Sequence, residues 1–127
     1  ANEFQLLTDD TNIETTLFIL PQGFDDFENF LDLIDLTNQL IDELGYRSTY
    51  QVAHFHPDYC FEGEKENDPA NFTNRAPYPT LHLLREASLQ KAIESYPDTS
   101  AIPDNNIKLA RKLGFDKMQA LLNNCIK

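Results

Sequence analysis

All three histidines of this chain lie in two nearby segments, 51–62 (QVAHFHPDYCFE) and 74–86 (NRAPYPTLHLLRE). His54 and His56 are two residues apart, so on a β-strand their side chains project from the same face. Two imidazoles in that arrangement can share a divalent ion that lies about 2.0–2.1 Å from each ring nitrogen. If the chain folds His82 against them, the three rings are candidate metal ligands. The alternative is that these histidines are core or loop residues that bond to main-chain carbonyls.

Two acidic residues, Asp58 and Glu86, lie beside the histidines in the sequence. Either carboxylate would complete a set of three nitrogens and one oxygen that suits zinc or iron and leaves room for a bound water. Such a metal would lower the pKa of its water or polarise a carbonyl. Without a metal, His56 and His82 are candidate acid–base groups. We therefore predict His56, His82, Asp58 and Glu86 as candidate catalytic residues.

Two arginines, Arg75 and Arg85, give the same region a second chemistry. Each guanidinium is a planar fork of donors that matches a carboxylate or a phosphate, so a small anionic ligand is the predicted partner. The neutral groups expected to assist them are Asn71, Asn74, Tyr59 and Tyr78. The alternative is that Arg85 pairs with an acid and that Arg75 ties down a loop, since ordering a long loop requires such contacts.

These patterns leave three functions open. The first is a small-molecule enzyme with a His/Arg/acid site, metal-assisted or acid–base, that acts on an anionic substrate. The second is a non-catalytic binder of a small anionic ligand in the same place. The third is a structural or interaction domain in which the His/Arg cluster locks a long loop. Clustering of these residue types favours a site but does not choose among the three, because ion-pair networks gather the same groups.

Composition narrows the class of protein. The 127 residues suffice for one domain with a single core, and the formal net charge is −11. The first 68 residues hold 16 of the 21 acids and two of the ten bases. With no basic patch to neutralise phosphates, nucleic acid and anionic membranes are not expected partners.

No apolar run approaches the ~20 residues of a membrane span, and the N-terminus lacks the pattern of a secretory signal. Two cysteines favour a reducing, cytoplasmic location.

The elements expected around the site are a strand, a helix and a second strand. Residues 15–20 and 49–56 are rich in β-branched and apolar side chains, and each run is followed by a proline. Between them, 27–44 repeats apolar residues at helical spacing, with Asp25 or Asp26 as N-cap and Gly45 as terminator. The sequence thus predicts an α/β fold with a small, largely parallel sheet that contains a βαβ unit.

Residues 57–79 carry many prolines, asparagines and aspartates and predict a long ordered loop folded over the sheet edge. The stretch 80–97 is either a helix from its start or a strand followed by a helix, and we favour the helix slightly. Two C-terminal helices are expected at 105–113 and 117–126. Because two strands alone are unstable, 80–86 or a partner chain must add another, so self-association is an expectation.

The strings QVAHFHPDYCFEG, NFTNRAPYPTLHLLREASLQKAI and IPDNNI resemble the bacterial family catalogued as domain of unknown function 1415, over residues 14–121. The resemblance implies a family without an assigned activity. It carries over the candidate positions His56, Asp58, Tyr59, Arg75, His82, Arg85 and Glu86.

Two departures from that family pattern affect the interpretation. The family begins with a further strand and helix that include a Cys-Pro-Phe segment, which this sequence lacks, so the resemblance implies an N-terminally incomplete chain. The family pattern also has a small residue at the position of His54, which weakens the three-histidine metal site.

Overall fold

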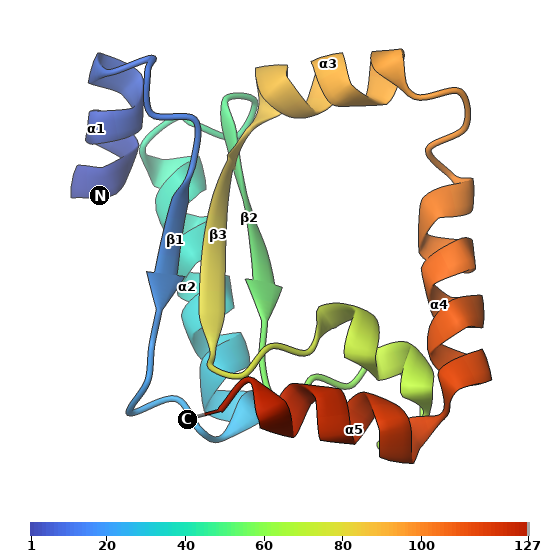
Figure 1. Ribbon diagram of the computed structural model, residues 1–127. Coiled ribbons are helices and arrows are strands. Elements are labelled where there is room, and N and C mark those ends of the chain that lie inside the picture. The colour runs from blue at the N-terminus through green and yellow to red at the C-terminus, as the bar shows by residue number, and fades with distance from the viewer. Residues whose placement is uncertain (127) are drawn as a thin grey trace.

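A three-stranded antiparallel sheet forms the centre of the protein, whose computed structural model describes residues 1–126. Its strands are β1 (Thr16–Ile19), β2 (Tyr50–Phe55) and β3 (Thr80–Arg85), in the order β1-β3-β2 (Figure 1). Both outer strands are antiparallel to β3. β1 and β2 therefore point the same way but never pair, because β3 lies between them.

The prediction of a largely parallel sheet with a βαβ unit is wrong. It assumed that β1 and β2 are neighbours, as consecutive strands often are. The slight preference for a helix from the start of 80–97 is also wrong, since β3 precedes α3 (Glu86–Ser95). In β3 Leu81 and Leu83 are buried and alternate with half-buried side chains, which is the period of a strand. None of the six side chains of β3 is exposed, whereas three of the four in β1 are, as expected of a central strand and an edge strand.

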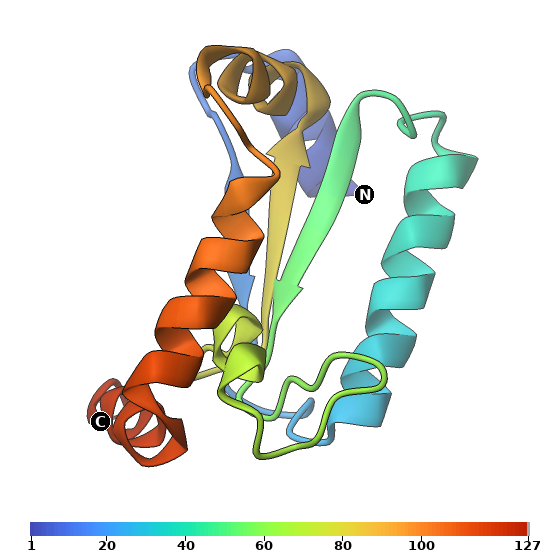
Figure 2. The ribbon, with the colours of Figure 1, turned by 90° about the vertical axis from the view of Figure 1, so that its right-hand side faces the viewer.

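Helix α2 (Phe27–Glu43) covers one face of the sheet (Figure 2). It begins as predicted at Asp26, whose carboxylate accepts from the amides of Glu28 and Asn29 at 2.8 and 3.2 Å. It ends before Gly45, which has a φ of +75°. The buried stripe of α2 packs on β3, with Phe30, Ile34 and Leu81 in one cluster.

A helix that the sequence patterns did not predict, α1 (Asn2–Asp9), precedes β1. It is short and has no side-chain cap, so helical propensity alone does not account for it. Phe4 and Leu7 are buried with Ile41, Tyr50 and Leu83, so α1 completes the second core cluster.

The C-terminal third stands apart from the sheet. α3 follows β3 directly, and α4 (Ala101–Leu113) and α5 (Phe115–Asn124) complete an open frame of helices (Figure 1). These last two helices begin four and two residues earlier than predicted. α4 packs on a 3-10 helix, η1 (Pro69–Asn74), instead of on the sheet, and Phe72 meets Phe115 at 5.5 Å between ring centroids. Within residues 1–126, none of the helices combines the length and apolarity that crossing a membrane requires.

Candidate functional site

The register of β2 against β3 separates the histidines. Ala53 lies opposite His82, and His54 lies opposite Leu81. Directly opposed residues share a face of an antiparallel pair, and neighbours along a strand alternate faces. His54 therefore lies on the face covered by α2, and His82 lies on the opposite face. Because the whole sheet separates the two rings, they do not share a ligand.

This arrangement does not assemble the metal set of His54, His56 and His82. In the described part of the chain, no three His, Cys, Asp or Glu side chains gather in a way that would hold an ion. The register of β2 against β3 therefore argues against the predicted three-histidine zinc or iron site.

His56 follows β2 and is completely buried. Its Nε2 donates to the carbonyl oxygen of Phe24 at 2.8 Å, and its Nδ1 accepts from the amide of Asp58 at 3.0 Å. The ring is therefore in the neutral Nε2–H form, since Nδ1 serves as an acceptor. Phe27 and Phe30 pack on the ring, each with a centroid separation of 5.2 Å. Both nitrogens are occupied by main chain, and neither faces solvent.

Asn71 in η1 is the second completely buried polar residue. Its Oδ1 accepts from the amide of Phe61 at 2.9 Å, and its Nδ2 donates to the carbonyl of Lys65 at 2.8 Å. A longer contact of 3.5 Å reaches the carbonyl of Glu66. The same Nδ2 also contacts the Sγ of Cys60 at 3.7 Å, so one side chain bonds to four positions of the loop and closes the arc from Cys60 to Glu66.

Arg75, at the end of η1, is half-buried and also bonds to the loop. Its Nε donates to the carbonyl of Tyr59 at 3.0 Å, and its Nη2 donates to the carbonyl of Glu66 at 2.9 Å. The guanidinium lies over the ring of Phe72, 4.6 Å from the centroid. Burial lowers the pKa of Arg75, and the nearby carboxyl of Asp58 partly offsets this. The fork predicted for an anion is occupied by carbonyl oxygens.

Arg85 lies at the far end of β3, about 17 Å of strand away from the loop. Its Nε donates to the carbonyl of Glu14 at 3.2 Å, and its Nη2 reaches the carbonyls of Leu7 and Asp10 at 2.6 and 3.3 Å and also that of Ile13. Arg85 therefore holds the end of α1 and its connection to β1. The two arginines do not converge on one ligand.

The remaining predicted residues are dispersed. Asp58 is exposed, Glu86 begins α3, and the amide of Asn74 donates to the carbonyl of His54 at 3.4 Å. Tyr59 packs on Phe27 with a centroid separation of 5.3 Å, and burial raises the pKa of its hydroxyl. The carbonyl of Tyr78 accepts from Thr80.

His54 differs from His56 in having a buried ring nitrogen without a partner. Its Nδ1 is the one buried side-chain nitrogen or oxygen among residues 1–126 that has no hydrogen-bond partner. The ring is half-buried between Phe30 and Tyr59, at centroid separations of 6.3 and 5.6 Å. Burial lowers its pKa, because the charged form loses solvation.

The family model described as a protein of unknown function, DUF1415, matches residues 1–120. The chain belongs to the DUF1415 family. The match confirms the resemblance inferred from the quoted strings and extends it to the first residue. Comparisons with curated proteins and with solved structures gave no significant match.

This DUF1415 chain also contains a hollow that sequence reasoning missed. It measures about 1060 Å³ and lies between the start of α2 and the loop. Seven carboxylate side chains line it, from Asp25, Asp26, Glu28, Asp58, Glu62, Glu64 and Glu66. Three aromatic rings lie among them, those of Phe27, Tyr59 and Phe61. The acidity of the first 68 residues was visible in the sequence, but its concentration in one hollow depends on how the loop folds back.

Arg111 of α4 fixes the other side of the loop in this family member. Its Nε and Nη2 donate to the two carboxylate oxygens of Asp68 at 3.2 and 3.0 Å, and Asp68 also caps η1 through the amide of Ala70. The bond from Arg111 is the main cause that lowers the pKa of Asp68 to about 2. Because η1 packs on α4, this fork joins the loop to the C-terminal helices.

Replacing Arg111 by Met should make stability less sensitive to acid. A carboxyl with a lowered folded-state pKa stabilises the fold above its unfolded pKa, near 3.9, and loses this contribution as the pH falls toward 2. In the wild type the melting temperature should therefore drop between pH 4 and pH 2 by more than in R111M. The melting temperature across that window is the measurement. Equal slopes would show that the fork contributes nothing.

Proposed function

We propose that this protein is a non-catalytic interaction domain, in which His56, Asn71 and Arg75 are framework residues that hold the loop 57–79 in one conformation. The observation that carries the proposal is His56, one of the two candidate acid–base residues. Its ring is completely buried, and both ring nitrogens bond to main chain. A catalytic acid or base must reach a substrate atom, and this ring reaches none.

The arginines support the same proposal. Both guanidinium groups point to main-chain carbonyls, and they lie at opposite ends of β3. A binder of a small anion needs donors that converge on one place. Here the donors are used within the protein, so the anionic substrate or ligand has less support than the structural lock.

The surface that the locked loop presents suggests the chemistry of the partner. The hollow beside the loop is lined by carboxylates and by the aromatic rings of Phe27, Tyr59 and Phe61. Carboxylates attract a cation, and aromatic faces attract it further at short range. The partner that fits is a basic segment of another protein.

A peptide titration tests this function. A hexa-arginine peptide should bind the wild type at low salt, whereas hexa-glutamate and inorganic phosphate should not, as measured by calorimetry. The variant E28K/E62K, which changes two carboxylates of the hollow, should weaken binding of hexa-arginine by about tenfold. The matched control E43K/E94K makes the same change in net charge at exposed positions outside the hollow.

The control variant E43K/E94K shows whether hexa-arginine recognises the hollow or only the net charge. Equal weakening by both double variants would indicate attraction to the net charge alone and would contradict a defined surface. Tight binding of phosphate by the wild type would restore the hypothesis of an anionic ligand.

A further inference from the structure

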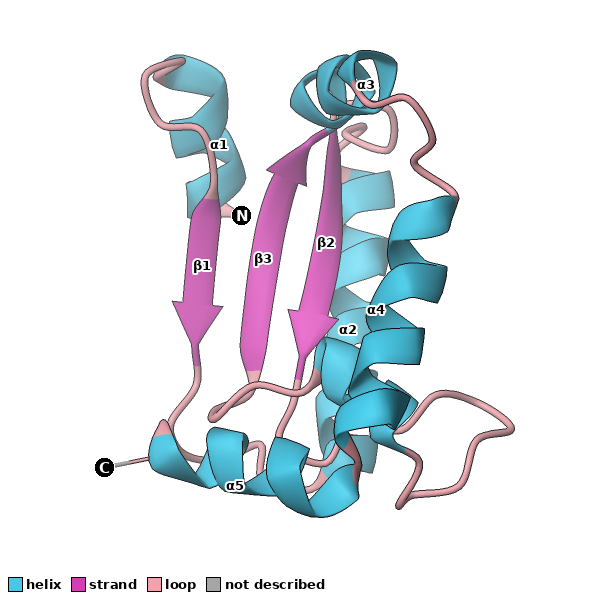
Figure 3. Ribbon diagram, turned by 45° about the vertical axis from the view of Figure 1, so that its right-hand side comes forward, coloured by secondary structure: helices cyan, strands magenta, loops and turns pink. Residues whose placement is uncertain are grey.

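Strand β1 has one free edge. It pairs with β3 on one side, and no described residue pairs with its other side (Figure 3). The amide of Leu20 donates to the carbonyl of Pro79, which shows which peptide groups point toward β3. Because these directions alternate along an antiparallel strand, Leu17 and Ile19 direct their N–H and C=O groups to the free edge. That edge is a template for another strand.

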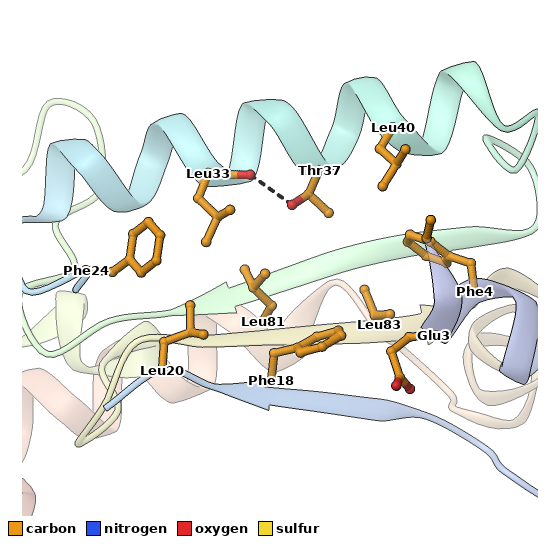
Figure 4. A pocket seen from close by; sticks show the side chains of 11 residues that line it. Glu3, Phe4, Phe18, Leu20, Phe24, Leu33, Thr37, Leu40, Leu81 and Leu83 are labelled. Atoms are coloured by element: carbon orange, nitrogen blue, oxygen red, sulfur yellow. Dashed lines mark hydrogen bonds between the residues drawn. The ribbon is translucent and has the colours of Figure 1, made fainter. Parts of the chain in front are cut away.

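An apolar groove opens along the face of β1 that α2 only partly covers (Figure 4). It measures about 280 Å³ and runs between α2 and the inward side chains of β1 and β3. In Figure 4, Phe18 of β1 and Leu20 just after it approach the groove from one side, and Leu33 and Leu40 approach it from α2. The only charged side chain in its lining is Glu3. A strand added at the free edge would direct every second side chain toward this groove.

The opposite face of β1 is apolar as well. Leu17 is 56% exposed and Ile19 is 59% exposed. An added strand must therefore be apolar on both of its faces. Residues 15–24 contain no charge in a chain with a net charge of −11, so β1 itself supplies none of the charged groups that usually protect free edges. The carboxylate of Glu3 in α1 contacts the start of the strand, where it accepts from the Thr16 hydroxyl at 3.4 Å. β1 itself meets the requirement, since Phe18 faces the groove and Leu17 and Ile19 face away.

We propose that β1 pairs antiparallel with β1 of a second copy of this chain and forms a continuous six-stranded sheet. A twofold axis normal to the sheet at Phe18 places Leu17 opposite Ile19 of the second copy. These are the residues whose peptide groups face the edge, so they can exchange both hydrogen bonds on each side of the axis. Phe18 then lies opposite Phe18 of the second copy, where the two apolar grooves open toward each other. This association uses the β1 edge and the groove beside it, whose lining shares no residue with the acidic hollow, and it does not depend on the proposed function.

The mass of the full wild-type chain tests the proposal. Sedimentation equilibrium up to millimolar concentration should show a reversible monomer–dimer equilibrium. Because each copy is strongly acidic, added salt should screen the repulsion and lower the dissociation constant. A four-residue edge is small beside stable interfaces of about 800 Å² per partner, which is why a wide concentration range is needed. A wild-type chain that stays monomeric throughout overturns the proposal.

Two variants locate the interface. I19K should raise the dissociation constant by about tenfold or more, since a charge on a flat edge opposes strand pairing. L36K is the matched control, because Leu36 is 61% exposed on α2, away from β1. Melting temperatures of both variants establish that they fold. If I19K dimerises like the wild type, or if L36K dissociates equally, the edge is not the interface.

A disulfide tests the register without relying on I19K. In the proposed pairing, position 18 lies opposite position 18 of the second copy as a non-hydrogen-bonded pair, with the two Cα atoms about 4.5 Å apart. This separation is within the range of disulfide geometry, so the variant F18C can cross-link the two copies. Mild oxidation should yield a dimer linked through this position, as mapped by mass spectrometry, whereas L17C should not link to itself. Efficient linkage through L17C would exclude this register, and linkage through neither variant would count against the pairing itself.

Discussion

Replacing Asn71 by Asp should lower the free energy of unfolding by about 3 kcal/mol at pH 8. The side chain is completely buried, and its amide donates to the carbonyls of Lys65 and Glu66. A carboxylate offers no hydrogen to those oxygens and would be buried beside them. The expected loss of stability therefore has two causes, the loss of the hydrogen bonds that the amide donates and the desolvation of a buried charge. Chemical denaturation with urea measures it.

The cost of N71D should depend on pH, with a sign that identifies its cause. A carboxyl buried among carbonyl oxygens has a folded-state pKa above its unfolded value, which is near 3.9. The protonated form is favoured in the folded state, so the destabilisation should grow as the pH rises above 4. At pH 4 the acid regains one donor, and the difference from the wild type should be smaller.

Asn67 provides the matched control, because it lies in the same loop and is exposed. N67D should change the free energy of unfolding by no more than about 0.5 kcal/mol at either pH. Equal effects of N71D and N67D would mean that the loop is not held by Asn71, and the framework would lose one of its three residues.

The second large effect is expected at His56. H56A should cost about 4 kcal/mol, because it removes a buried ring between Phe27 and Phe30 together with two hydrogen bonds. H56F keeps a ring of similar size and should cost about 2 kcal/mol, which is the polar part alone. The difference between the two variants separates packing from hydrogen bonding.

H82F is the control for His56, since His82 is only partly buried and lies on the opposite face of the sheet. Its effect on the free energy of unfolding should stay within about 1 kcal/mol. If H56F is as stable as the wild type, the bonds to Phe24 and Asp58 contribute nothing, and His56 would have been retained for another reason.

Local patterns in the sequence predicted most of the elements. The apolar repeat of 27–44, the cap at Asp26 and the stop at Gly45 are features of a few adjacent residues, and they locate α2 correctly. Strands β1 and β2 were found for the same reason. The order of strands is a different kind of property. It depends on contacts between segments far apart in the sequence, and 80–85 was ambiguous because Leu81, Leu83 and Leu84 fit both the alternation of a strand and the spacing of a helix face.

For the candidate site, too, the sequence indicated the unusual residues but not the contacts that depend on the fold. The sequence identified His56, Arg75 and Arg85 as unusual residues, and each does make specific polar contacts. What it could not reveal is that their partners are backbone carbonyls, because every residue carries one and none is marked by a side chain. The separation of His54 from His82 follows from a register that needs β3 as a strand. Asn71 gave only a weak signal, an asparagine among several in a polar loop.

The proposed loop framework depends most on the state of the His56 ring, and nitrogen-15 NMR of the imidazoles measures that state directly. The prediction is a neutral ring with its proton on Nε2, an Nε2–H resonance that exchanges slowly with water, and no change on addition of phosphate. An Nδ1–H tautomer, or an Nε2–H that exchanges rapidly with water, would contradict the assignment of His56 to the framework. It would return this residue to the candidates for chemistry.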